Sequence, residues 1–275
     1  MDLYSQVSMQ LSKQLTRSYS SSFSASSLLF SREIRREIYA IYGLVRIADE
    51  IVDTYRGKDQ RKLLDNLEKE TYDAIKRQYS VNPIVHAFAL SASKFNIDKQ
   101  LIEPFFASMR SDIDPATSFT QKAYDEYIYG SAEVIGLMCL RVFVDGDNES
   151  YERLKQGAQK LGAAYQKTNF LRDFASDYSE LGRIYFPGVA FDTFTDEQKN
   201  VIVKDIQADF AEAKIALTKL PDSSRRAVKA SYNVYKELLD ELALASADTI
   251  KASRIRLSNW RKSQLILTSL ANQEK

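Results

Sequence analysis

The sequence predicts an all-α protein, and three observations support this. Apolar residues recur at the 3.6-residue period of amphipathic helices along nearly the whole chain. Glycine and proline are few, with nine Gly and five Pro among 275 residues, and the clearest helix breakers fall between the periodic segments. The segments are also long, and none requires a strand, so no sheet is expected.

The helices can be placed in order from the periodic segments and the breakers. They are expected over residues 5–17, 32–55, 59–79, 82–94, 98–112, 120–145, 148–178, 196–219, 223–248 and 253–271. The residues that separate them include Gly57, Asn82-Pro83, Asp114-Pro115, Gly146, Gly182, Pro187-Gly188 and Pro221-Asp222. One longer connection covers residues 183–195. Short connections and apolar faces are typical of a helical bundle, and without a Gly/Ser-rich linker we expect a single domain over residues 1–275.

Composition excludes several classes of protein. Lys and Arg number 38 against 37 Asp and Glu, and this balance argues against a nucleic-acid binder. Cys139 is the only cysteine and lies in an apolar helical run, which favours a buried thiol and a reducing compartment. His86 is the only histidine, so zinc-hydrolase motifs are not expected. Glycine-rich nucleotide-binding loops are also absent from the sequence.

The sequence also bears on location. The first ten residues are polar and lack the apolar region of a signal peptide, and no segment approaches the roughly 20 apolar residues of a membrane span. We therefore expect a cytoplasmic protein with no obligate protein partner. The C-terminal segment Lys251–Leu270 combines basic residues with Trp260 and leucines. It is interpreted as a last helix packed on the core with a basic outer face, or alternatively as a surface helix that contacts an anionic membrane.

Two acidic motifs of the same form lie far apart in the chain. Asp49 and Asp53 bound Asp-Glu-Ile-Val-Asp, and Asp173 and Asp177 bound Asp-Phe-Ala-Ser-Asp. Four residues rotate an α-helix by roughly 400°, so the two carboxylates of each motif would share a face about 6 Å apart. Mg²⁺ is usually held by one or two protein carboxylates together with substrate phosphates. The two motifs therefore predict a magnesium–diphosphate clamp.

The residues around both motifs favour a site over a solvated surface. A single Asp-x-x-x-Asp motif is typical of an exposed helix, but here apolar residues flank both copies. Arg46 precedes the first motif and Arg172 the second, and a guanidinium recognises phosphate bidentately. Asn169 lies one turn before the second motif on the same face, and Gln166 stands three residues earlier. A metal clamp on a diphosphate leaving group would start carbocation chemistry.

Three further segments have both a structural and a functional interpretation. The hydroxyl-rich residues 18–24 could cap a helix or hold phosphate oxygens. Residues 127–136 place small side chains inside a helix, either for close helix packing or to leave room for a substrate. Tyr232 and Tyr235 precede an acidic segment and could simply be core tyrosines.

Taken together, these segments resemble the squalene/phytoene synthase family of head-to-head prenyl synthases, and its bacterial phytoene synthases most closely. The similarity runs from Ser18 to Glu241. Its most specific motifs are Arg-x-x-Asp-Glu-Ile-Val-Asp, Tyr-Gly-Ser-Ala-Glu-Val-Ile-Gly, Asn-Phe-Leu-Arg-Asp-Phe-Ala-Ser-Asp and Arg-Ile-Tyr-Phe-Pro. The resemblance implies an isoprenoid synthase-type single-domain helical bundle around a central cavity.

The resemblance also implies a set of site residues. Across the cavity two pairs of aspartates would face each other and hold Mg²⁺ with one asparagine: Asp49, Asp53, Asp173, Asp177 and Asn169. The residues implied to contact the prenyl diphosphates are Ser20, Ser22, Tyr42, Arg46, Gln166, Asn169, Arg172 and Tyr235. Tyr129 matches a cavity tyrosine that assists the carbocation steps. The chain departs from the family pattern at Glu133, where many members have Gly, and at Tyr19, where several have His.

The function implied is the Mg²⁺-dependent head-to-head condensation of two geranylgeranyl diphosphates, through a cyclopropyl diphosphate, to phytoene. One alternative uses farnesyl diphosphate to form squalene or dehydrosqualene. An alternative of another class is a noncatalytic helical assembly factor, although all four aspartates of the clamp are present here. A head-to-tail or cyclising terpene synthase would leave the Tyr-Gly-Ser-Ala-Glu and Arg-Ile-Tyr-Phe-Pro segments unexplained.

Overall fold

The prediction of an all-α protein is confirmed. The structure, a computed structural model, describes residues 1–19, 26–113 and 119–271, and no β-strand occurs among them. The helices of the first half are α1 (Leu3–Tyr19), α3 (Arg32–Asp49), α4 (Gln60–Arg77), α5 (Pro83–Phe95), α6 (Lys99–Ile113), α7 (Gln121–Ile128) and α8 (Val134–Phe143). Those of the second half are α9 (Asn148–Arg172), α10 (Phe174–Leu181), α11 (Asp196–Leu217), α12 (Asp222–Leu244), α13 (Ala247–Ala252) and α14 (Asn259–Ala271).

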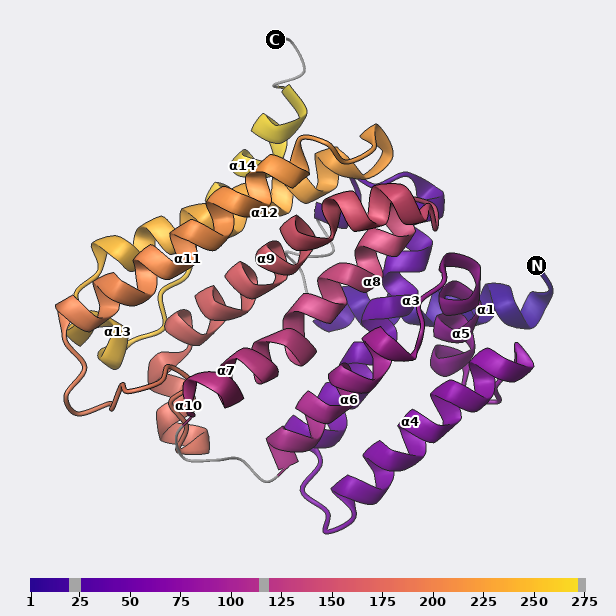
Figure 1. Cartoon of the computed structure of the whole chain (residues 1–275), viewed down its shortest axis with the longest axis horizontal. Coiled ribbons are helices and arrows are strands. Elements are labelled where there is room, and N and C mark those ends of the chain that lie inside the picture. The colour runs from indigo at the N-terminus through magenta and orange to yellow at the C-terminus, as the bar shows by residue number, and fades with distance from the viewer. Residues whose placement is uncertain (20–25, 114–118, 272–275) are drawn as a thin grey trace.

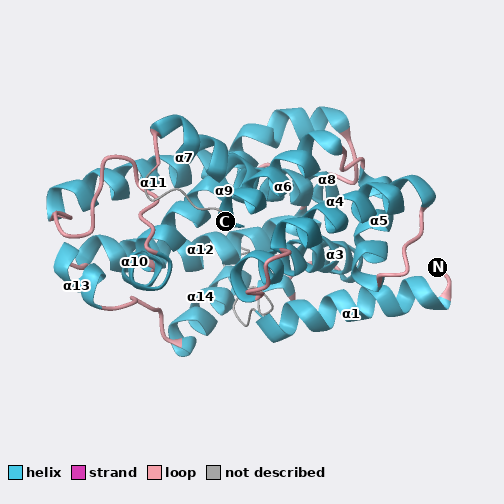
Figure 2. Cartoon of the chain, turned by 90° about the horizontal axis from the view of Figure 1, so that it is seen from below, coloured by secondary structure: helices cyan, strands magenta, loops and turns pink. Residues whose placement is uncertain are grey.

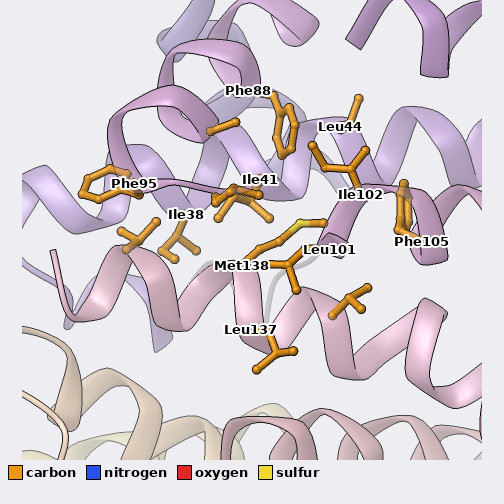
Figure 3. Close-up of a cluster of buried hydrophobic side chains, with 14 of the residues drawn as sticks. Ile38, Ile41, Leu44, Phe88, Phe95, Leu101, Ile102, Phe105, Leu137 and Met138 are labelled. Atoms are coloured by element: carbon orange, nitrogen blue, oxygen red, sulfur yellow. The ribbon is translucent and has the colours of Figure 1, made fainter. Parts of the chain in front are cut away.

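Most buried apolar side chains of the described helices belong to two large hydrophobic clusters, and a small third cluster includes Met9 of α1. In the first cluster, side chains from α3, α5, α6 and α8 meet, including Ile41, Phe88, Ile102 and Met138 (Figure 3). In the second half, α9, α11 and α12 lie side by side (Figure 1). The second cluster includes residues of the connection after α10, where the Tyr185 ring stacks on Phe170 with centroids 3.9 Å apart. This connection is thereby fixed against the helices, although it is not helical itself.

Three of the predicted helices contain irregular segments, and each irregular segment coincides with a motif. The predicted helix 32–55 ends in a π-helical segment, η1 (Glu50–Thr54), which holds part of the first acidic motif. The predicted helix 120–145 is interrupted by a second π-helical segment, η2 (Tyr129–Glu133). The predicted helix 148–178 breaks at Asp173, which has φ −96° and ψ 9°. Such π-helical segments occur frequently at functional sites because they reorient side chains without ending the helix.

The C-terminal boundaries also differ from the prediction. The helix predicted over 223–248 ends at Leu244, and α13 starts separately because Ser246 caps it, accepting a hydrogen bond from the Thr249 N–H at 3.2 Å. Residues 253–258 are not helical, so the last helix begins at Asn259 rather than at 253. It lies against α12, where Asn233 donates a hydrogen bond to Ser269 at 3.1 Å.

No described helix is long and apolar enough to cross a membrane.

Candidate active site

The first acidic motif lies where α3 changes from α- to π-helical geometry. Asp49 is the last residue of α3, and Asp53 lies in η1. Arg46, one turn earlier, places Nη1 3.6 Å from Asp49 Oδ2 and also pairs with Glu50. The buried face of α3, with Ile38, Ile41 and Leu44 in the core, holds this end of the helix in place. The predicted association of an arginine with the first motif is therefore present in the folded chain.

Aromatic residues extend this end of the site. The Arg46 guanidinium lies 4.2 Å from the ring centroid of Tyr19, the last residue of α1. Tyr42 lies one turn before Arg46, and burial raises the pKa of its phenol. The positive charge of Arg46 opposes this rise, and the negative charge of Asp49 adds to it. Tyr235 stacks on Tyr165 with centroids 4.0 Å apart.

The second acidic motif lies at the junction of α9 and α10. Arg172 holds the Asp173 carboxylate bidentately, with Nε 2.8 Å from Oδ1. Arg254, from the segment after α13, places its Nε 2.6 Å from the same oxygen. Asp177 N–H donates to the Asp173 carbonyl at 2.8 Å, so the motif keeps the hydrogen-bond spacing of an α-helix through the break. The helix therefore breaks at Asp173 itself, while Asp177 stays one turn further along the chain.

A buried ion pair lies between the two motifs. Arg183 Nη1 is 2.7 Å from Asp112 Oδ1, Nη2 donates to the Asp112 carbonyl at 2.7 Å, and both side chains are buried. Tyr127 donates from its hydroxyl to the same carboxylate at 2.9 Å. Burial raises the pKa of both Asp53 and Asp177, and the positive charge of Arg183 opposes part of each rise. The backbone N–H of Arg183 also donates to the Asp177 carbonyl at 3.1 Å, and α6, which carries Asp112, packs against η1, so the pair connects the regions of the two motifs.

The carboxylates of this site are crowded. Burial raises the pKa of Asp49 to about 7, and the negative charge of Asp53 adds to the rise. Burial likewise raises the pKa of Asp177 to about 7, with Asp173 adding to it. The pKa of Asp112 rises to about 6 through burial, although Arg183 opposes the change. A site in which buried like charges raise one another's pKa is one that a cation would stabilise.

The donor set also suits Mg²⁺. The amide oxygen of Asn169 is buried without a hydrogen-bond partner among the described residues, and it lies one turn before Asp173. A buried oxygen without a hydrogen-bond partner is a suitable ligand for a hard cation. Within the described ranges, however, no three acidic, His or Cys side chains gather closely enough to form a complete metal site. The five predicted metal ligands therefore fit the ion chemically, and their coordination stays a prediction.

The remaining predicted residues lie as follows. Tyr129 begins η2 and packs partly buried against the first cluster. Gln166 is half-buried on α9, one turn before Asn169. Ser20 and Ser22 lie outside the described residues. The predicted central cavity also stays a prediction.

Sequence reasoning missed three residues that the fold brings to the motifs. Arg183 begins the Arg-Ile-Tyr-Phe-Pro segment, and the sequence alone indicates no partner for it. From the sequence, Asp112 is expected only as a helix end, and Arg254 as part of a basic outer face. An arginine embedded in an apolar segment was a signal for Arg183, because a buried guanidinium requires a partner. Neither Asp112 nor Arg254 had a comparable local signal.

Comparison with known proteins assigns the chain to a family. Residues 16–261 match the sequence profile described as Squalene/phytoene synthase. The chain belongs to this family. Phytoene synthase 1, chloroplastic, from Zea mays is 32% identical over 78% of this chain and 57% of its own length. The chain thus spans little more than half the length of this plant relative.

A bacterial relative is matched over most of its length. The 4,4'-diapophytoene synthase of Staphylococcus haemolyticus is 26% identical over 86% of this chain and 87% of its own. Two solved structures share the fold. A dehydrosqualene synthase has a TM-score of 0.82 at 23% identity, covering 97% of this chain and 96% of its own. The squalene synthase HpnC from Alicyclobacillus acidocaldarius has a TM-score of 0.78 at 22% identity, covering 93% and 98%. The expected isoprenoid synthase fold is confirmed.

Proposed function

We propose that this protein condenses two molecules of geranylgeranyl diphosphate head to head, through a cyclopropyl diphosphate, to phytoene. The phytoene synthases among its relatives support this choice of substrate. The observation that carries the proposal is the position of Arg183, whose N–H donates to the Asp177 carbonyl and whose guanidinium pairs with Asp112 on α6, the helix that packs against η1. Two carboxylate pairs and an arginine between them can receive the diphosphates of two substrates at one site.

The side chains divide into groups that hold charge and groups that exclude water. Mg²⁺, when held by Asp49, Asp53, Asn169, Asp173 and Asp177, would neutralise the leaving diphosphate and so favour ionisation. Arg46 and Arg172 each approach one motif and can bind diphosphate oxygens bidentately. Further contacts with the two diphosphates are proposed for Tyr42, Gln166, Tyr235, Ser20 and Ser22.

The allylic chains require an environment without water, because water would quench a carbocation. Tyr129 stands at the start of η2, where burial raises the pKa of its phenol. A neutral phenol at this position can orient the reacting chain and accept a hydrogen bond without acting as a strong nucleophile. Glu133 lies at the other end of the same segment, and Gln159 donates a hydrogen bond to it at 3.1 Å. This contact directs the unusual carboxylate toward α9.

A second candidate uses farnesyl diphosphate. The observation in its favour is the 4,4'-diapophytoene synthase, which matches over a larger share of both chains than the plant relatives do. Both candidates use the same acidic motifs and differ in the length of chain that the site accepts.

Product analysis separates the two candidates. The purified protein is incubated with Mg²⁺ and either geranylgeranyl or farnesyl diphosphate, with and without NADPH, and the extracted hydrocarbons are identified by mass spectrometry. We expect phytoene from the C20 substrate at a higher kcat/KM than any C30 product, and no change with NADPH. Preferential turnover of the C15 substrate would favour the second candidate, and absence of any product would favour the noncatalytic assembly factor.

A further inference from the structure

The apolar side chains of α9 do not decide by themselves which side of this helix faces the site. The helix lies between α11 on one side and α8 with η2 on the other (Figure 1; Figure 2). Its buried side chains Tyr151, Ala164 and Phe170 point in three directions roughly 120° apart around the helix axis. A helix that buries apolar groups on several sides has no single apolar stripe to fix its rotation.

The closest contacts of α9 with its neighbours are made by small residues. A Cβ added at Gly157 would lie 2.1 Å from the Ala216 Cβ of α11. A Cβ added at Gly162 would lie 2.6 Å from the Ala132 carbonyl oxygen of η2. Glycine and alanine allow the backbones to approach closely, but they provide no ridge that could enter a groove of the neighbouring helix. At these positions the contact surfaces therefore resist rotation and sliding only weakly.

A buried carboxylate of α11 holds α9 at two points. The side chain of Asp209 is 4% exposed, and its Oδ1 accepts a hydrogen bond from Lys160 Nζ at 2.9 Å. Its Oδ2 accepts a second one from Lys167 Nζ at 2.7 Å. The two lysines stand seven residues apart in the sequence, which is two turns and about 10 Å along the helix. Because one carboxylate holds both lysines, α9 can neither turn nor slide along α11 without breaking a buried ion pair.

A further polar contact ties the same part of α9 to η2. Gln159, the residue before Lys160, donates a hydrogen bond to Glu133 at 3.1 Å. Glu133 is the last residue of η2, the segment that begins at Tyr129. Polar contacts therefore fix α9 to both of its neighbours.

Helix geometry connects the two lysine contacts with the site. Lys167 and Asn169 are two residues apart, or roughly 200° around α9, so their side chains point to opposite sides of the helix. Gln166 lies within roughly 60° of Asn169 on the same side. While Asp209 holds Lys167 against α11, the amide groups of both residues are turned away from α11. A rotation of α9 would displace these two amides together.

We propose that Asp209 is a positioning residue for the candidate active site: by holding Lys160 and Lys167 it fixes the rotation and register of α9, and thereby places Gln166 and Asn169. The inference rests on the proposed function, because it assigns Asp209 a role at the same site. Asp209 acts through α9, since it contacts the side of the helix opposite to Asn169. Buried ionic groups often add little stability compared with apolar residues, and fixing a register is their best-attested use.

Replacement of all three charged groups by apolar ones separates positioning from stability. The triple variant Lys160→Met/Lys167→Met/Asp209→Leu leaves none of these charges behind, so its melting temperature should equal or exceed that of wild type. The charges then no longer fix the register of α9, and we expect kcat/KM with geranylgeranyl diphosphate to fall at least about tenfold. The affinity for inorganic diphosphate with Mg²⁺, measured by isothermal titration calorimetry, should fall about fivefold or more for the same reason.

Two control variants change ion pairs that do not fix α9. Lys69→Met/Asp73→Leu replaces an exposed pair of α4 by the same apolar residues, and kcat/KM and the diphosphate affinity should stay unchanged. Asp205→Asn removes a second partner of Lys167, which is 58% exposed and lies 2.6 Å from its Nζ. Because Asp209 still holds both lysines in this variant, kcat/KM should fall at most about twofold.

Failure of this inference and failure of the proposed function give different results. A triple variant that equals wild type in kcat/KM and in diphosphate affinity would overturn the role of Asp209 and leave the proposed function standing. A triple variant that melts well below wild type would overturn that role as well, because the ion pairs would then be structural. Wild type that binds diphosphate but forms no product would contradict the proposed function, and the diphosphate affinity of the triple variant would then decide the role of Asp209. Wild type that binds no diphosphate would overturn both.

Discussion

At the scale of single residues, the Asp112–Arg183 pair is the most informative feature of the site. Its two side chains come from segments 71 residues apart, and both are buried. A buried guanidinium is stabilised only when its partners are in place, so Asp112 and Tyr127 together fix where the charge of Arg183 lies. Only Arg183 carries a local signal, an arginine in an apolar segment, and its partner is not predictable because the pairing exists only after α6 and the connection after α10 have packed.

The substitution Asp112→Asn tests this positioning role. It keeps the shape of the side chain but leaves Arg183 without its counter-charge, so we expect the free energy of unfolding to fall by about 2–4 kcal/mol. The kcat should fall more than the KM rises, since the variant misplaces a charge without removing a substrate contact. Asp73→Asn, which breaks the exposed pair with Lys69 on α4, is the control and should cost at most about 0.5 kcal/mol. Unchanged stability and turnover in Asp112→Asn would remove the pair from the site.

The aspartates of the clamp should make metal-free stability depend on pH. Asp49 has a folded pKa of about 7, above its ordinary value of 3.8, so the folded protein holds a proton that the unfolded chain releases. The free energy of unfolding should therefore fall as the pH rises from 4 to 7 and stay low above that range. Asp49→Asn removes the ionisable carboxyl group and with it this loss of stability at high pH. With allowance for partial exposure, we expect it to stabilise the metal-free protein by about 2 kcal/mol at pH 8.

Thermal unfolding in chelator over pH 4–8 measures this effect. Addition of Mg²⁺ at pH 8 should stabilise the wild type more than Asp49→Asn, because the variant has lost a ligand. Asp125→Asn, at an exposed position of α7, should change neither the pH dependence of stability nor the stabilisation by Mg²⁺. A variant that is less stable than wild type at pH 8 without metal would show instead that Asp49 is a structural ion-pair partner of Arg46.

At the scale of elements, the irregular segments mark the limit of what the sequence could predict. Most helices follow from periodicity and breakers, and their ends agree within a few residues. The break at Asp173 could not be predicted, since its carboxylate meets Arg254, 81 residues away. Likewise the π-helical segment η2 depends on close packing against α6. Both depend on tertiary contacts that override local preference.

Substitution of Gly130 tests the packing of η2. A Cβ at this position would lie 2.2 Å from the Pro104 carbonyl oxygen and 2.1 Å from Ser108 Oγ on α6. We expect Gly130→Ala to destabilise the protein by about 2–4 kcal/mol, because backbone must move to admit the methyl group. Gly182→Ala is the comparison: it meets no atom within 4 Å and bears only the strain of φ +64°, so it should cost about 1 kcal/mol. Equal losses of stability in the two variants would mean that α6 and η2 separate readily. That result would favour the interpretation that the small residues leave room for a substrate.

At the scale of the whole molecule, the Asp112–Arg183 pair connects the regions of the two acidic motifs, which come from different halves of the chain. The first acidic motif ends α3 in the first half of the chain, and the second lies at the junction of α9 and α10 in the second half. The sequence predicted both pairs of aspartates because their spacing is local. It did not predict the ion pair between them, which depends on how α6 and the connection after α10 meet.

The central claim is that the two motifs act as one clamp, and a double-mutant cycle tests it most directly. Turnover of geranylgeranyl diphosphate is measured with Mg²⁺ for wild type, Asp49→Asn, Asp173→Asn and the double variant. If both motifs serve the same ionisation, each single substitution should lower kcat/KM by at least about 100-fold, and the double variant should be little worse than either. Losses that multiply in the double variant would show that the motifs act independently and would contradict the clamp.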